Sequence, residues 1–215
     1  LDEKAKIGSS LSSLYPSERI IDVEITPNRS DCLGVYGIAR DLAASGEGVF
    51  IEKKVFNIKN KFKSKINVKI SKEAKLACPV FYGRYIKNVK NCESPEWLKK
   101  QLQAVGLKPI SALVDITNYL TIDYNRPLHV FDADKIDGNL EIYLAKGEEN
   151  LKALDEKDYK LSKEMIAIKD NKALLSIAGV IGGTSTMCDL NTKNVFLESA
   201  FFDPISVAKT GRLLN

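Results

Sequence analysis

Histidine is almost absent from this sequence, since His129 is the only one among 215 residues. Cysteine is scarce too: four stand at positions 32, 78, 92 and 188, and no two form a Cys-x-x-Cys pair. These residues do not have the ligand spacing of a zinc site. We therefore expect no metal site, and we expect reduced, mostly buried thiols of a cytoplasmic protein.

Long apolar runs are also missing. No stretch approaches the roughly 20 apolar residues that a membrane span needs, and the start of the chain lacks the apolar core of a signal peptide. The first residue is Leu1 rather than methionine. We expect a fragment of a longer cytoplasmic protein that does not contact a membrane.

Several catalytic motifs are absent. The sequence has no Gly-x-Ser-x-Gly elbow, no GxGxxG fingerprint and no P-loop. A Ser-His-Asp triad would have to use His129, and no serine stands in the context of a nucleophile elbow. Motifs alone therefore give little support to nucleophilic hydrolysis or to nucleotide-phosphate binding.

The composition that remains is that of an ordinary globular protein, with 44% hydrophobic and 28% charged residues. The net charge of +4 is modest, but lysines gather between residues 53 and 75. Such a stretch is either a solvated face or a surface that attracts a phosphate backbone. The chain is long enough for one large domain or two small ones.

The first part of the chain predicts a strand over residues 20–25, a turn, and a helix. Ser30 or Asp31 can cap this helix, which is expected to end near Ser45 because Gly46 follows. A charge-rich stretch then leads into an alternating strand at 65–70. The change in composition predicts a domain boundary between residues 48 and 70.

The rest of the chain predicts helices first and strands afterwards. A strand at 78–89 precedes a helix with Ser94 as N-cap, Pro95 at its first position and Gly106 after its end. Ser111 then caps a second helix. Strands are expected at 128–132, 140–146, 165–170, 173–181 and 194–202, followed by a helix from 204. This order predicts an α+β fold with helices flanking a mainly antiparallel sheet. In the helix that Ser94 is expected to cap, the buried face should comprise Trp97, Leu98, Leu102 and Val105.

Polar residues in apolar surroundings are candidates for a site. Thr117 and Asn118 are weak helix formers inside a helix, where they either bond back to the backbone or serve a site. His129, flanked by Leu128 and Val130, is either a structural histidine or a site residue. Glu198 shares one face of its strand with Phe196 and Ala200. Burying its carboxylate is costly unless a ligand or a partner such as Arg84 or Arg126 pairs with it.

The glycine-rich stretch "SIAGVIGG" at residues 176–183 follows a strand. Glycine lets backbone N–H groups approach a ligand closely, although a sharp turn explains the same sequence. Both interpretations stay open on the residues alone.

Five blocks of the sequence together resemble the bacterial phenylalanyl-tRNA synthetase beta subunit. In chain order they are "ITPNRSDCLGVYGIARDLAA", "GLKPISALVDITNYL", "RPLHVFDADKI", "AGVIGG" and "LESAFF". The resemblance implies that residues 1–48 are the C-terminal part of the preceding domain, 49–69 a linker, and 70–215 the B3/B4 editing domain with a truncated last helix. It also implies an α2β2 tetramer with an alpha subunit, which joins phenylalanine to tRNA(Phe) using ATP and magnesium. The synthetic site of this family is on the alpha subunit, so no cofactor is expected in this chain.

The resemblance further implies an editing pocket that hydrolyses tyrosine wrongly attached to tRNA(Phe). Glu198 and the N–H of Gly179 read the tyrosine hydroxyl in this family pattern, and small side chains at Ala178 and Ala200 leave room for the ring. Thr117 belongs to the same substrate-binding set. His129 and Asn118 are expected to orient water or the tRNA end. The alternative is a non-catalytic scaffold module of the same subunit that contacts tRNA.

Overall fold

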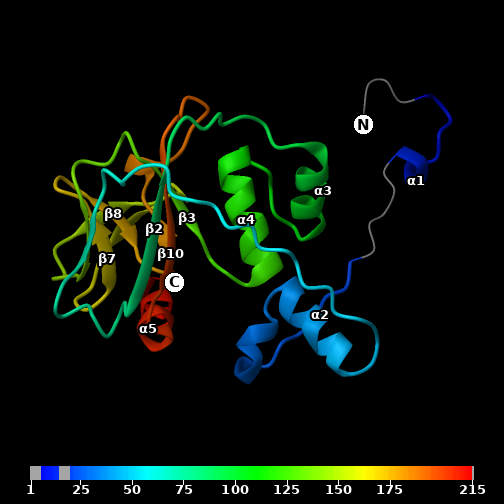
Figure 1. The fold of residues 1–215 in the computed structure, drawn as a ribbon, viewed down its shortest axis with the longest axis horizontal. Helices are drawn as coiled ribbons and strands as arrows, with labels where there is room; N and C mark the ends of the chain where they lie inside the picture. Colours follow the sequence, from blue (N-terminus) through cyan, green and yellow to red (C-terminus); the bar gives the residue numbers. More distant parts are fainter. Residues whose placement is uncertain (1–5, 15–19, 215) are drawn as a thin grey trace.

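The protein is described here by a computed structural model that covers residues 6–14 and 20–214. From left to right in Figure 1, a larger sheet, a smaller sheet and a pair of helices lie against one another. The smaller sheet has the order β2-β10-β3 and is antiparallel throughout. Its strands are β2 (Val80–Ile86), β10 (Val195–Phe201) and β3 (His129–Asp132).

The larger sheet has the order β1-β4-β7-β8-β9. Its strands are β1 (Val68–Ile70), β4 (Leu140–Leu144), β7 (Ile166–Lys169), β8 (Leu174–Ile177) and β9 (Ile181–Gly182). Only the β1–β4 pair in this sheet is parallel. A hairpin of β5 (Asn150–Lys152) and β6 (Asp158–Lys160) forms a further small sheet. The expected α+β fold with mainly antiparallel strands is confirmed.

The main core lies between the two larger sheets. Phe131 and Phe196, which pair across β3 and β10, pack there with Ile142 and Ile168 of the larger sheet. Burial of each such side chain contributes about 1.5–3 kcal/mol. Because strand residues alternate between faces, neighbouring Val130 belongs to a second cluster that includes Leu113 of a covering helix.

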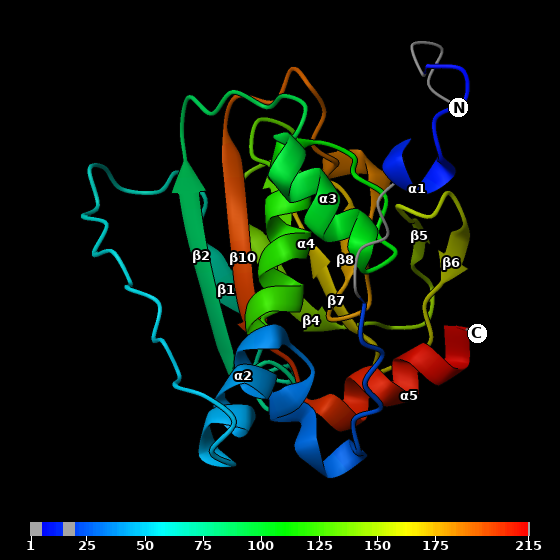
Figure 2. The same cartoon turned by 90° about the vertical axis from the view of Figure 1, so that its right-hand side faces the viewer.

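Helix α4 (Ala112–Tyr124) covers the outer face of the smaller sheet, and α3 (Glu96–Ala104) packs against the far side of α4 (Figure 1). Figure 2 shows the same two helices from the side. Helix α3 begins one residue later than predicted, because the Ser94 hydroxyl donates to the Asp115 carboxylate at 2.5 Å instead of capping α3. Gly106 follows its end with a φ of +79°, as expected. The C-terminal helix α5 (Pro204–Leu214) also matches the prediction.

The predicted buried face of α3 is only half correct. Leu98 and Leu102 are buried, whereas Trp97 is 57% and Val105 is 49% exposed. The Trp97 ring contacts Tyr119 edge to face, with ring centroids 5.6 Å apart. The apolar face of α3 is therefore wider than the part of it that α4 covers.

The N-terminal part differs most from its prediction. Residues 20–25 form no strand in the structure, and the helix predicted from residue 30 divides into two. A 3-10 helix, η1 (Pro27–Cys32), comes first, and α2 (Val35–Ala44) follows after Gly34. Gly34 is extended, with a φ of −138° and a ψ of 161°, and this separates the two helices. A short α1 (Leu11–Leu14) precedes them.

Residues 46–65 run outside the sheets without helix or strand (Figure 2). The sequence did not predict the short strands β5, β6 and β9. A strand of three residues or fewer is too short to show alternation, although the strand predicted at 65–70 includes β1. A 3-10 helix, η2 (Thr184–Thr186), follows β9. In the described part of the chain, no helix has the length and apolarity that crossing a membrane requires.

Candidate functional site

A pocket of about 640 Å³ opens where the smaller sheet, the glycine-rich stretch and the start of α5 meet. Its lining includes His129 from β3, Glu198 and Ala200 from β10, and Gly179 from the turn after β8. Elements distant in the sequence therefore bring these four predicted site residues together. Volumes of this size are typical of small-molecule sites.

Glu198 and His129 face each other across the antiparallel β10–β3 pair. Residues directly opposite in such a pair project from the same face of the sheet, with Cβ atoms about 4.5–5.5 Å apart. On the other neighbouring strand Gly83 lies opposite Glu198. A Cβ at Gly83 would lie within 2.9 Å of Phe196 Cε1, so the absent side chain leaves space for that ring beside the carboxyl group.

Glu198 is only 6% exposed, and its Oε2 atom has no hydrogen-bond partner within the described residues. Burial raises the pKa of this group to about 8. At neutral pH the group is therefore mainly protonated, and it can donate as well as accept a hydrogen bond. An unsatisfied buried polar atom costs about 1–3 kcal/mol, which a ligand with a complementary group would recover.

A structural partner does not account for Glu198. The Arg84 guanidinium donates instead to the carbonyl of Ile58 and to the side chain of Asn60. Arg126 lines the pocket but forms no ion pair with Glu198. Of the two interpretations open for this carboxyl group, the structure favours a ligand.

The His129 ring is held by packing, and within the described ranges its side chain makes no hydrogen bond. It meets Phe131 edge to face, with ring centroids 4.3 Å apart. A Cβ at Gly182 would lie 2.9 Å from His129 Nε2, so the ring needs glycine at that position. Burial lowers the pKa of His129 to about 4. The ring is therefore neutral at pH 7 and better suited to orienting a water molecule than to removing its proton.

Gly179 takes the left-handed conformation, with a φ of +73°. A Cβ there would lie 2.8 Å from Val207 Cγ2, which adds a steric reason for glycine. The next amide, that of Val180, closes the turn onto the carbonyl of Ile177 at 3.0 Å. The Gly179 N–H itself has no acceptor among the described residues, so it is available to a ligand in the pocket.

The other predicted site residues do not line this pocket. Ala178 is buried in the main core, and its N–H donates to the Ile166 carbonyl at 2.9 Å. The Thr117 hydroxyl donates back to the carbonyl of Val114 at 2.7 Å. Asn118 follows it on α4, and its side chain makes no hydrogen bond in the described part of the chain.

Sequence reasoning missed several lining residues. The Ser176 hydroxyl donates to the Ile181 carbonyl at 3.1 Å, and the stretch "SIAGVIGG" already contained this residue. Leu33, Phe202 and Val207 line the pocket as well, but ordinary apolar residues give no local signal of a site. Arg126 was considered only as a partner of Glu198.

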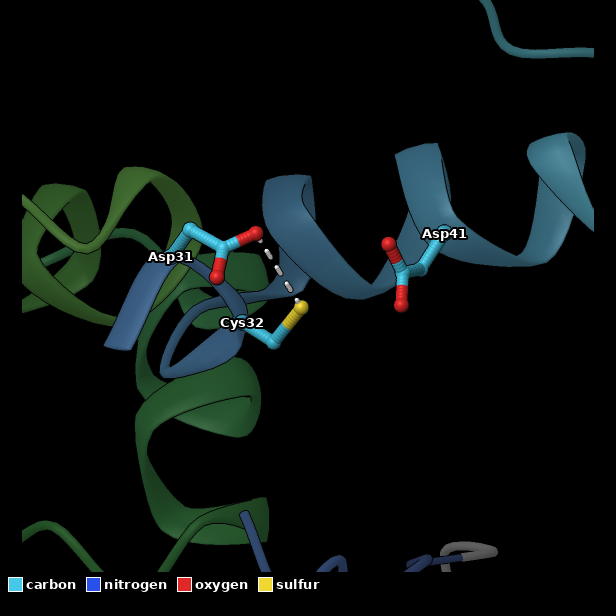
Figure 3. A group of neighbouring side chains, drawn as sticks. All are labelled: Asp31, Cys32 and Asp41. Carbon is cyan, nitrogen blue, oxygen red and sulfur yellow. Dashed lines mark hydrogen bonds between the residues drawn. The ribbon is translucent and has the colours of Figure 1, made fainter. Parts of the chain in front are cut away.

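Outside this pocket, Asp31, Cys32 and Asp41 gather at the η1–α2 corner (Figure 3). Arg29 contacts Asp31 at 3.1 Å and Asp41 at 2.6 Å, and Arg40 also pairs with Asp31. Hydrogen bonds from Arg29 lower the pKa of both carboxyl groups. With guanidinium groups already on these oxygens, the cluster fits an ion-pair network rather than a cation site.

The four cysteines are free, and only Cys92 is exposed. Burial raises the pKa of Cys78 and that of Cys188 to about 11. These two thiols are therefore unreactive core residues, in agreement with the expectation of mostly buried cysteines.

Comparison with known proteins identifies the domain. A family model described as "B3/4 domain" matches residues 77–215. The phenylalanine–tRNA ligase beta subunit of Ruegeria pomeroyi is 53% identical over 196 residues, which is 91% of this chain and 25% of that protein. The beta subunit of Mesorhizobium japonicum is 49% identical, over 100% of this chain and 27% of its own length.

A solved structure is similar in fold. It is an N-terminal fragment of the phenylalanyl-tRNA synthetase beta subunit from Pyrococcus horikoshii, with a TM-score of 0.53 and 17% identity. The match covers 86% of this chain and 59% of that one. The chain spans about a quarter of the length of the curated relatives it matches. The chain therefore belongs to the B3/4 domain family and is part of a phenylalanine–tRNA ligase beta subunit.

Proposed function

We propose that this domain edits the product of its parent ligase by hydrolysing Tyr-tRNA(Phe). The observation that carries the proposal is the unpaired, buried carboxyl oxygen of Glu198 in a pocket large enough for an aromatic amino acid. Ala200 leaves space beside it, and the free N–H of Gly179 supplies a second polar group.

The selectivity follows from the one oxygen by which tyrosine and phenylalanine differ. A phenol can accept from the Gly179 N–H and form a second hydrogen bond with the Glu198 carboxyl group. Phenylalanine would exclude water from the same groups and leave them unpaired, at about 1–3 kcal/mol. A site built to bond a hydroxyl rejects the analogue that lacks it, so the correct product is spared.

Hydrolysis needs a water molecule at the ester carbonyl and stabilisation of the oxyanion. The water oxygen bonds to the carbonyl carbon, and the ester bond breaks to release tyrosine and the tRNA hydroxyl group. We assign to neutral His129 the orientation of this water or of the tRNA end. We propose Asn118 for the same task, and Thr117 and Ala178 as further members of the substrate-binding set, although none of the three lines the pocket in the described structure.

At the level of the whole protein, we propose a ligase that joins phenylalanine to tRNA(Phe) with ATP and magnesium in the cytoplasm. The alpha subunit, in an α2β2 tetramer, would carry that reaction. Within this chain we propose the predicted division into residues 1–48, 49–69 and 70–215, the last being the editing domain.

The test compares deacylation of Tyr-tRNA(Phe) and Phe-tRNA(Phe) by the parent ligase. We expect faster hydrolysis of the tyrosyl ester, and a loss of about 10–100-fold in this preference for Glu198→Ala. Glu148→Ala is a matched control, because Glu148 is exposed and lies outside the pocket. Equal, background rates with both esters in the wild type would contradict the proposal.

A scaffold or tRNA-contacting module is the second candidate. Large apolar side chains on residues 49–55 favour it, since Val49, Ile51 and Val55 are 83–90% exposed beside several lysines. Tyrosine binding separates the two functions. An editing pocket binds tyrosine more tightly than phenylalanine and loses this difference in Glu198→Ala, whereas a scaffold binds neither.

A further inference from the structure

One residue that lines the pocket lies outside the matched family region. Leu33 lines the pocket and is 59% exposed, although the match to the B3/4 domain begins only at residue 77. Arg126 and Pro127, from the connection between α4 and β3, line the same pocket. The η1–α2 corner therefore contributes directly to the site.

This corner is fixed against the end of α4, which both ribbon views place beside α2 (Figures 1 and 2). A Cβ at Gly34 would lie 2.6 Å from the backbone nitrogen of Asn125 and 2.8 Å from the carbonyl oxygen of Ile122. The Asn125 side-chain amide donates to the Ser30 carbonyl at 2.5 Å. Only glycine allows backbones to approach this closely.

Further contacts make the corner rigid. Tyr36 of α2 stacks on Tyr124 of α4, with ring centroids 5.4 Å apart. Ion pairs of Arg29 and Arg40 with Asp31 and Asp41 tie η1 to α2. Figure 3 shows where these two aspartates lie. Leu33 is thereby held in place although its own side chain is exposed.

The chemistry of the mouth differs from that of the pocket floor. The Arg126 side chain is exposed, and its guanidinium makes no hydrogen bond or ion pair within residues 6–14 and 20–214. Leu33 and Pro127 add apolar surface beside it. An exposed cation next to apolar side chains is suited to a nucleotide, whose base packs on the apolar groups while its phosphate meets the guanidinium.

We infer that Leu33 and Arg126 hold the terminal nucleotide of the tRNA, the one that carries the aminoacyl ester. The η1–α2 corner is then a working part of the editing site. The base packs against Leu33, and Arg126 binds a phosphate, which places the ester between the mouth and His129. This inference rests on the proposed editing function and adds the subsite for the tRNA end.

The experiment measures KM and kcat for Tyr-tRNA(Phe) deacylation by the parent ligase, together with the Kd of free tyrosine. For Leu33→Asp and Arg126→Gln we expect KM to rise about 5–20-fold, because each loses a contact with the nucleotide. The Kd of free tyrosine should stay unchanged, since tyrosine has no nucleotide. Leu190→Asp, at an exposed leucine outside the pocket, and Arg126→Lys are the controls.

Salt dependence adds a readout that a purely structural role would not change. In Arg126→Gln the slope of log KM against log salt concentration should fall by about 0.7, as expected for one lost phosphate contact with a single strand. If Leu33→Asp lowers the melting temperature of the ligase, the result for Arg126→Gln alone tests the inference. The Arg126 side chain has no partner among the described residues, so this substitution breaks no contact of the fold.

The outcomes separate the inference from the proposed function. No deacylation and no tyrosine binding in the wild type would remove the editing function itself. An active wild type with unchanged KM and salt slope in both variants would overturn the inference only. A parallel loss of free-tyrosine binding in the variants would also overturn it, because the mouth would then shape the pocket rather than bind the nucleotide.

Discussion

Carboxyl groups occur in two contrasting settings in this molecule, the pocket beside β10 and the η1–α2 corner. In the pocket, Glu198 is buried and one of its oxygens has no partner among the residues that the structure describes, and burial raises its pKa to about 8. At the corner, Asp31 and Asp41 are exposed to solvent and paired with Arg29, which lowers the pKa of both. The acidic residues are similar, but their surroundings reverse the direction of the shift.

The difference shows how a site residue can be told from a structural one. A buried polar group that the fold leaves unpaired lowers stability, so its retention points to a ligand. A paired and exposed carboxylate already has its partner and needs no ligand. On this criterion we propose that Glu198 is a site residue and that the acids of the corner have a structural role.

The largest expected effect that tests this contrast is the pH dependence of stability. The Glu198 pKa is raised, so the folded chain keeps a proton that the unfolded chain loses above about pH 4.5. The contribution of this proton to the unfolding free energy is complete below about pH 4.5. It falls as pH rises, by up to about 1.4 kcal/mol per pH unit, and is lost once pH has risen through about 8. Glu198→Gln should remove this loss.

Urea denaturation of the chain at pH 5, 6, 7 and 8 measures the difference in unfolding free energy between Glu198→Gln and the wild type. We expect this difference to grow in favour of the variant as pH rises. A constant difference would mean that the carboxyl group is ionised in the folded state and has found a partner.

The contrast also explains how much of the site the sequence could predict. Glu198 and His129 stood out because a polar residue inside an apolar strand has a cost, and both line the pocket. Gly179 stood out because a glycine-rich stretch follows a strand. Leu33 and Val207 are ordinary apolar residues far apart in the chain, and only the tertiary fold brings them to the same pocket.

The fold was predictable to a similar degree. Long strands such as β2 and β10 are rich in aromatic and β-branched residues, and helix ends show their glycines. The strand predicted at 20–25 is wrong because alternation needs a neighbouring strand, and no strand pairs with these residues in the described part of the chain. The division of the strands into facing sheets depends on long-range pairing that no local pattern contains.

The second expected effect has the opposite sign and concerns His129. Burial lowers its pKa from 6.5 to about 4. Between these pH values the ring is protonated in the unfolded chain and neutral in the folded chain. The stabilising contribution is complete above about pH 6.5 and is lost as pH falls to about 4. We expect up to about 1 kcal/mol per pH unit, since partial exposure of the ring weakens the effect.

His129→Gln should therefore be less sensitive to acid than the wild type when unfolding free energies are compared at pH 4, 5 and 6. Between about pH 4.5 and 6.5 the contributions of His129 and Glu198 oppose each other. In this range, the slope of unfolding free energy against pH in Glu198→Gln should reflect His129, and the slope in His129→Gln should reflect Glu198. Identical slopes in His129→Gln and the wild type would show that the ring titrates normally and is accessible to water.

The smallest effect is expected at the corner. In Asp41→Asn, Arg29 keeps its contact with Asp31, and exposed ion pairs contribute little. We expect the melting temperature to change by less than about 3 °C and the KM for Tyr-tRNA(Phe) to stay within about twofold of the wild type. Magnesium or zinc ions should not change the melting temperature of either protein, because guanidinium groups already occupy these carboxylates. A stabilising response to a cation that disappears in Asp41→Asn would show that the corner binds a metal, and the distinction between paired and unpaired carboxylates would then fail at this cluster.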